Sequence, residues 1–110
     1  MRGRMRDFPK ELIIGESSWK VRWRRSIPEG GDRCVGLCDP ETKTIHIRMG
    51  QTPAERVSTL LHELMHCAEV EYKFELKHKD IYRLEGPLAQ ILLQNAWVQW
   101  ADWQTEEEAC

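Results

Sequence analysis

The chain is organised around residues 52–66, TPAERVSTLLHELMH, in which a helix start is followed by two histidines four residues apart. Thr52 and Glu55 have the spacing of a capping box, and Pro53 stands at the first helical position, where its missing N–H costs nothing. Apolar residues then recur at helical intervals, at Val57, Leu60, Leu61, Leu64 and Ala68. Because neither Gly nor Pro interrupts residues 54–71, the sequence predicts a helix of this length whose apolar stripe faces the core.

The two histidines of this helix can face a single metal ion. His62 and His66 lie about 6 Å apart along the axis, on a flank beside the apolar stripe. Glu63 is adjacent to them and can take a proton from a zinc-bound water. The spacing therefore predicts a zinc centre for hydrolysis, in which Glu63 is the general base.

A catalytic zinc site usually has three protein ligands and leaves the fourth position to water, so a third ligand is needed. The downstream side chains that could bind zinc are Glu69, Glu71, Glu75, His78, Asp80 and Glu85. Glu69 and Glu71 are excluded because they lie on the same helix, Glu69 about 10 Å along the axis from His62. Glu75 falls in the expected connection between two helices, at residues 72–77, and is kept as a weaker alternative.

A second helix is predicted by another set of apolar residues at helical spacing, at Ile81, Leu84, Leu88, Ile91 and Leu92. Glu85 projects from this apolar face, where an unpaired charge is costly and a zinc ion would compensate it. We therefore expect Glu85 to be the third zinc ligand. His78 and Tyr82, on the same flank, are expected to line the cleft, and either could donate a hydrogen bond to the developing oxyanion. Gly86-Pro87 is expected to kink or restart this helix.

These residues together resemble the gluzincin group of zinc metallopeptidases, in which a His-Glu-x-x-His motif is followed by a glutamate on the next helix. The likeness covers about residues 38–97. Within it, residues 39–48 and 59–66 are similar to small metallopeptidases encoded by tailed phages and prophages. The metzincin pattern does not fit, because it needs a glycine and a third histidine where this chain has Glu69 and Tyr72.

The resemblance implies a cofactor, a substrate and a role for each site residue. Zinc would be bound by His62, His66 and Glu85, with Glu63 as the catalytic residue. The activity implied is hydrolysis of peptide bonds by a metal-activated water, in an endopeptidase acting on a peptide or protein substrate.

The first half of the chain predicts β structure. Short apolar or alternating runs occupy residues 12–14, 19–24, 34–38 and 44–48, separated by a loop at 26–32 and a turn at 39–43. We expect an α+β fold with a small antiparallel sheet followed by two main helices. This order resembles the zincin plan, in which an edge strand beside the active helix receives extended substrate, and residues 44–48 are the candidate for that strand. His46 on this strand is expected to be structural or exposed.

Composition predicts one domain over residues 1–110, with flexible ends near 1–7 and 104–110. The chain has 110 residues, of which 41% are hydrophobic, and a net charge of −2. No apolar run could span a bilayer and no apolar region follows the basic N-terminus, so we expect a cytoplasmic protein, in the host cell if the chain is phage-encoded. The near-neutral charge argues against a general nucleic-acid binder, although the first quarter is locally basic. The oligomeric state is left open.

The cysteines and tryptophans give weaker indications. Cys34, Cys38, Cys67 and Cys110 are expected to be reduced, since no secretory signal is visible, and Cys67 is expected to pack in the core. Trp97, Trp100 and Trp103 recur every third residue and are expected to cap the core, with a partner-binding or dimerisation patch as the alternative.

Two other hypotheses compete with the enzyme. The first is a non-enzymatic interaction domain with a structural zinc ion, in which His78 closes the coordination shell. Glu63 argues against it, because a structural site has no need of a carboxylate between its histidines. The second is a pair of core histidines without any metal.

Overall fold

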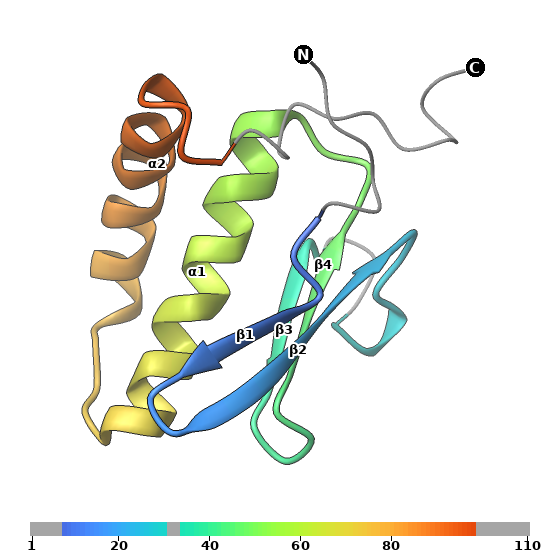
Figure 1. Cartoon of the computed structure of the whole chain (residues 1–110), viewed down its shortest axis with the longest axis vertical. Coiled ribbons are helices and arrows are strands. Elements are labelled where there is room, and N and C mark those ends of the chain that lie inside the picture. Colours follow the sequence, from blue (N-terminus) through green and yellow to red (C-terminus); the bar gives the residue numbers. More distant parts are fainter. Residues whose placement is uncertain (1–7, 31–33, 99–110) are drawn as a thin grey trace.

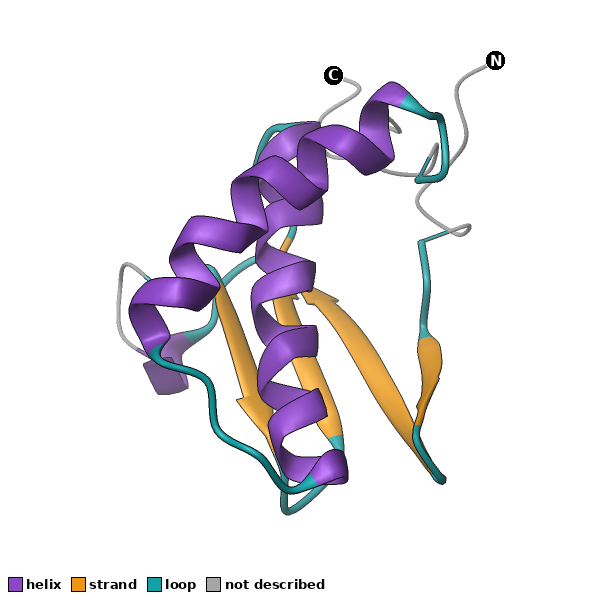
Figure 2. Cartoon of the chain, turned by 90° about the vertical axis from the view of Figure 1, so that its left-hand side faces the viewer, coloured by secondary structure: helices purple, strands orange, loops and turns teal. Residues whose placement is uncertain are grey.

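The computed structural model describes residues 8–30 and 34–98 and has the predicted α+β fold. Its elements are β1 (Glu11–Ile14), β2 (Ser17–Arg24), the 3-10 helix η2 (Pro28–Gly30), β3 (Gly36–Asp39), β4 (Thr44–Arg48), α1 (Pro53–Tyr72) and α2 (His78–Gln94). Both helices lie on the same side of the sheet, with α1 between the sheet and α2 (Figure 1, Figure 2). The site histidines of α1 therefore lie near the layer that α2 forms.

The sheet is mixed, which corrects the expectation of an antiparallel sheet. Its strand order is β1-β2-β4-β3. β1 pairs antiparallel with β2 and β3 antiparallel with β4, but β2 and β4 run parallel. The apolar side chains of β4, Ile45 and Ile47, are completely buried, so this strand takes a central place and β3 is left at the edge. The sequence predicts the turn that joins β3 to β4, but neither the pairing of β1 with β2 nor the parallel pairing of β2 with β4.

Because β4 is central, the edge strand expected at residues 44–48 is a wrong assignment. The two edge strands are β1 and β3, and β3 is the one next to β4. In the antiparallel ladder with β4, the backbone of Val35 accepts a hydrogen bond from Arg48 N at 2.9 Å. The alternation of the ladder then turns the backbone groups of Gly36 and Cys38 toward the free edge.

Helix α1 begins as the sequence predicts. Glu55 N donates to Thr52 Oγ1 at 3.2 Å and Thr52 N donates to Glu55 Oε1 at 3.0 Å, so the capping box is complete, and Pro53 occupies the first turn. The helix has two apolar sides. Leu60 packs on the sheet, in a core with Trp19, Val21, Ile45, Ile47 and Cys67, whereas Val57 packs toward α2. The predicted burial of Cys67 is confirmed.

Helix α2 differs from expectation in two ways. It does not restart at Gly86-Pro87 but continues through Pro87, and Gly86 has no Cβ to collide with the proline ring. Its predicted apolar stripe is only partly buried: Ile81 is fully buried, but Leu84, Leu88 and Ile91 are 44%, 38% and 47% exposed. Because α2 packs on α1 and not on the sheet, only a narrow face of it is covered.

Of the three tryptophans expected to cap the core, the structure describes only Trp97, and Trp97 does not pack on the core. Trp97 is 69% exposed, so its assignment to the core is wrong. Trp100 and Trp103 lie outside the described residues. Within residues 8–30 and 34–98, no helix has both the length and the hydropathy needed to cross a bilayer.

Glu71 ties the end of α1 to the start of β2 and to the turn before β4. Its carboxylate accepts hydrogen bonds from Ser17 Oγ at 2.8 Å and from Trp19 Nε1 at 2.9 Å, and it forms an ion pair with Lys43. The Lys43 ammonium group, followed by the Ser17 hydroxyl, lowers the pKa of Glu71 below its usual value.

We expect Glu71→Gln to lower the melting temperature at about pH 7, and we expect this difference to shrink as the pH falls below the ordinary pKa of a glutamate. A carboxyl group with a lowered pKa stabilises the fold above its ordinary pKa, and this contribution is lost as the pH falls through the folded-state value. Thermal unfolding of both proteins across this range measures the difference. A gap that stayed constant with pH would show that the ionised carboxylate does not provide the stabilisation.

Candidate metal centre

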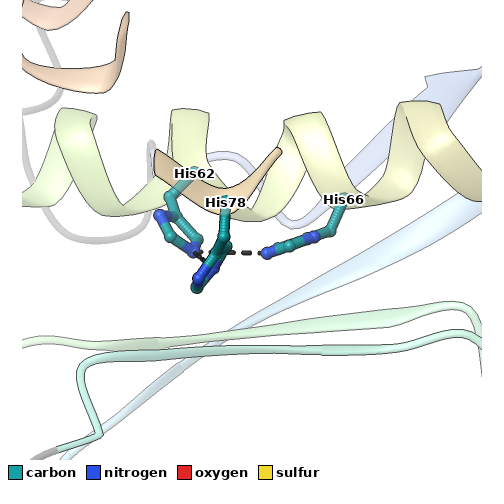
Figure 3. Close-up of side chains that lie close together, drawn as sticks. All are labelled: His62, His66 and His78. Atoms are coloured by element: carbon teal, nitrogen blue, oxygen red, sulfur yellow. Dashed lines mark hydrogen bonds between the residues drawn. The ribbon is translucent and has the colours of Figure 1, made fainter. Parts of the chain in front are cut away.

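Three imidazole rings converge in the space between α1 and α2. His62 and His66 come from the middle of α1, and His78 is the first residue of α2 (Figure 3). The Nε2 atom of His62 lies 3.3 Å from Nε2 of His66 and 3.2 Å from Nε2 of His78. One ring nitrogen from each histidine falls within 4.8 Å of the other two, which is close enough to hold a metal ion.

The spacing of these nitrogens fits zinc. Two nitrogens bound at about 2.05 Å to a tetrahedral zinc ion lie about 3.3 Å apart. Both measured separations from His62 Nε2 are within 0.1 Å of that value. Neutral imidazole nitrogens are also ligands that zinc prefers, so both the geometry and the chemistry of His62, His66 and His78 suit this ion.

The outer nitrogens of the two α1 histidines are held by carboxylates. His66 Nδ1 lies 2.7 Å from Glu69 Oε1, and His62 Nδ1 lies 3.4 Å from Glu85 Oε2. A carboxylate beside Nδ1 favours a proton on that nitrogen, which leaves the Nε2 lone pair free for a metal ion. Burial lowers the pKa of His62, which keeps its ring neutral and able to bind a metal.

Glu69 also reaches the connection between the helices. Its second oxygen, Oε2, accepts a hydrogen bond from the backbone N–H of Leu76 at 2.9 Å. This backbone hydrogen bond is the main reason that the pKa of Glu69 is lowered. Burial acts in the opposite direction, and the hydrogen bond with His66 lowers the pKa further. Glu69 is therefore a negatively charged group that fixes the His66 ring in place.

Glu63 is buried beside the histidines. The residue is 6% exposed, and burial raises the pKa of its carboxyl group to about 7. The nearby charge of His66 acts in the opposite direction. A carboxyl group with a pKa near neutrality can both accept and return a proton under physiological conditions, which is the property that a general base needs.

Gly36 on β3 leaves the room that the Glu63 side chain occupies. A Cβ atom at Gly36 would lie 2.8 Å from Glu63 Oε2 and 2.7 Å from Cγ2 of Thr59, both closer than ordinary contact. The absence of a side chain at this position lets the edge strand approach α1 closely. The Glu63 carboxylate is consequently enclosed by the strand on one side and the helix on the other.

We expect Gly36→Ala to destabilise the protein by about 1–3 kcal/mol, since the added methyl group overpacks a filled space. Gly50→Ala is the matched control, because a Cβ there meets nothing within 4 Å. Thermal and denaturant unfolding of the two variants provide the comparison. Equal stabilities would contradict the close packing of Glu63 against β3.

The histidines and Glu63 open onto a cavity of about 970 Å³. One wall is β3 and the residues just before it, including Cys34, Val35 and Leu37, and the other wall comes from the two helices and their connection. Tyr82 and Glu85 of α2 also line this cavity. A small molecule or an extended chain segment could therefore reach the metal-binding nitrogens.

The structure brings most of the expected site residues together, but His78 and Glu85 occupy each other's expected places. His78, expected to line the cleft, contributes a nitrogen to the metal-binding group, whereas Glu85, expected as the third ligand, lies against the outer nitrogen of His62. The ring of Tyr82 lies 4.7 Å from that of His78, as expected for a cleft residue. Glu75 lines the cavity but is not among the grouped ligand atoms.

Two residues of the site were missed in the sequence. Glu69 lies too far along the helix to share a metal ion with His62, but its i,i+3 spacing from His66 is that of side chains in contact on a helix, and this is the signal for its role. Gly36 gave no recognisable signal, because a single glycine in a short apolar run does not reveal what packs against it. His46, expected to be structural or exposed, lies on β4 with its Nδ1 3.4 Å from Arg24.

Comparisons with protein-family models, with curated proteins and with solved structures gave no significant match.

Proposed function

We propose that this protein is a zinc-dependent hydrolase of peptide bonds, with His62, His66 and His78 as the zinc ligands and Glu63 as the general base. One observation carries the proposal: three imidazole nitrogens lie within 4.8 Å of one another, with His62 Nε2 at the spacing of zinc-bound nitrogens from each of the other two, and two of the rings have a carboxylate at the opposite nitrogen. Without a cation, one of these nitrogens must carry a proton to form a hydrogen bond with another. A divalent ion satisfies all three at once.

Two features favour a catalytic over a structural zinc ion. Structural sites usually have four protein ligands, whereas the group formed by the described residues has three and faces an open cavity. A structural site also gains nothing from a buried carboxyl group, and burying Glu63 costs free energy unless the group is used. His78 completes a three-ligand set and leaves one position accessible from the cavity.

The residues of the chain have distinct roles in the proposed reaction. When bound, zinc would supply the Lewis acidity that activates a water molecule and polarises the scissile carbonyl group. Glu63, buried beside the histidines, is placed to take up the proton released from the water and to return it to the leaving amine. Tyr82, on the cavity wall, is the candidate hydrogen-bond donor to the carbonyl oxygen as negative charge develops there.

The edge of β3 suits an extended peptide substrate. The strand forms one wall of the cavity, and the backbone groups of Gly36 and Cys38 face its free edge. A peptide that pairs with this edge runs alongside α1, past Glu63. Because backbone hydrogen bonds would supply much of the binding, we expect weak dependence on substrate side chains.

The direct test loads the full chain with one equivalent of zinc and incubates it with a library of unstructured peptides. We expect cleavage within peptides, loss of cleavage after chelation and recovery when zinc is restored. Zinc bound tightly with no cleavage of any peptide would support a structural ion instead. Failure to bind zinc at all would remove the proposal.

A further inference from the structure

Two thiol groups lie side by side at the contact between β3 and α1. Cys38 Sγ is 3.7 Å from Cys67 Sγ, and the two residues are 29 positions apart in the chain. Cys38 is half-buried on the edge strand and lines the cavity, whereas Cys67 is completely buried and directly follows His66. The pair therefore has one member that a small solute can reach and one that it cannot.

We propose that Cys38 and Cys67 form a reversible redox pair, which a hydroperoxide converts to a disulfide that fastens β3 to α1. The sulfur atoms must approach each other by less than about 2 Å to bond. β3 is an edge strand, paired on one side only, so it can move by that amount more easily than a central strand. This inference does not depend on a metal ion at the histidines.

The accessible sulfur reacts first. The sulfur of Cys38 attacks one peroxide oxygen, the O–O bond breaks, and a sulfenic acid and one water (or alcohol) are formed. The sulfur of Cys67 then attacks the sulfur of Cys38, the S–O bond breaks, and a second water leaves with the proton of Cys67. In total, two thiols lose two electrons and two protons, and the hydroperoxide is reduced.

Cys34 is the competing partner, but its thiol is directed elsewhere. Its Sγ donates to the backbone oxygen of Gly36 at 3.0 Å, within its own segment. A bond between Cys34 and Cys38 would join residues four positions apart, and the segment between them includes extended residues of β3. The 3.7 Å contact across two elements gives Cys67 the shorter path.

The disulfide should stabilise the fold. It closes a loop that contains β4 and most of α1, and cross-links of this length restrict the unfolded chain considerably. We expect the melting temperature of the oxidised protein to rise by roughly 10 °C over that of the reduced protein. Added dithiothreitol should reverse the change.

The experiment uses the full chain with Cys34→Ser and Cys110→Ser, so that only the proposed pair remains. After brief treatment with hydrogen peroxide and removal of the excess, alkylation and mass spectrometry should show the loss of two hydrogen atoms and a cross-linked Cys38–Cys67 peptide. Dithiothreitol should restore two alkylatable thiols. A chain that instead carries extra oxygen on Cys38 and no cross-link would overturn the proposal.

Single variants separate the roles of the two sulfurs. With Cys67→Ser in this background, Cys38 should form a sulfenic acid that dimedone traps. With Cys38→Ser, the buried Cys67 should resist oxidation. Because Cys67→Ser alters the core, circular dichroism checks that this variant is folded. Cys38→Ser lies on the edge strand, so its result does not depend on a change in the core. Equal reactivity of Cys67 in the presence and absence of Cys38 would contradict the proposed order.

Discussion

Glu63→Gln should lower the rate of peptide hydrolysis by about 10²–10⁴-fold and leave zinc binding nearly intact. The amide keeps the shape of the side chain, so it should still fit against Gly36, but it cannot accept the proton. The measurement is kcat and KM on the best peptide of the library, with zinc content determined on the same samples. A fall in kcat with KM unchanged is the expected pattern.

Glu75→Gln is the matched control for this variant. Glu75 is an exposed residue on the wall of the same cavity, outside the group of metal-binding nitrogens, so its replacement makes the same chemical change without touching the reacting groups. We expect its activity to stay close to that of the wild type. If both variants lost activity equally, general electrostatics would explain the effect, and the role of Glu63 as base would be withdrawn.

Glu85→Gln should weaken zinc binding by about 10–100-fold, the range for residues that only orient a ligand. His78→Ala should weaken it by more than about 100-fold, because it removes a ligand. The reason is their place in the site: His78 directs Nε2 into the group, and Glu85 lies behind the His62 ring. Competition with a chromophoric chelator measures both affinities. The reverse order would make Glu85 the third ligand, as the sequence alone suggests.

Thermal unfolding gives a second measurement on the same proteins. Zinc held by α1 and α2 together should raise the melting temperature of the wild type, because a ligand that binds only the folded state stabilises it by mass action. His78 is exposed, so without zinc its alanine variant should unfold close to the wild-type temperature. Addition of zinc should then separate the two proteins. An identical response to zinc would show that His78 is not a ligand.

Helix α1 was predictable because its signals are local. The capping box at Thr52, the apolar spacing and the two histidines one turn apart are all set within consecutive turns of one helix. The mixed sheet could not be predicted, because the pairing of β2 with β4 joins segments about 24 residues apart. Nothing in either strand specifies a parallel neighbour. Only the complete burial of Ile45 and Ile47 indicates, after the fact, that β4 belongs in the centre.

The third ligand shows where sequence reasoning stops. The inference that Glu85 faces α1 was sound, since its side chain is only 16% exposed and lies beside His62. Which of His78 and Glu85 reaches the Nε2 atoms depends on how α2 crosses α1 and on where the connection places its first turn. Spacing along a helix carries no information about that crossing, so His78 and Glu85 could not be distinguished in advance.

The hydrogen bond from Leu76 N to Glu69 makes a single amide proton a natural probe of the site. That proton is held by the same carboxylate that holds the His66 ring, and its exchange with solvent deuterium requires this hydrogen bond to open. Protection of this proton thus measures how often the connection between the helices separates from Glu69. The connecting segment between the helices in this way reports on the rigidity of its contact with Glu69 in solution, without any substrate.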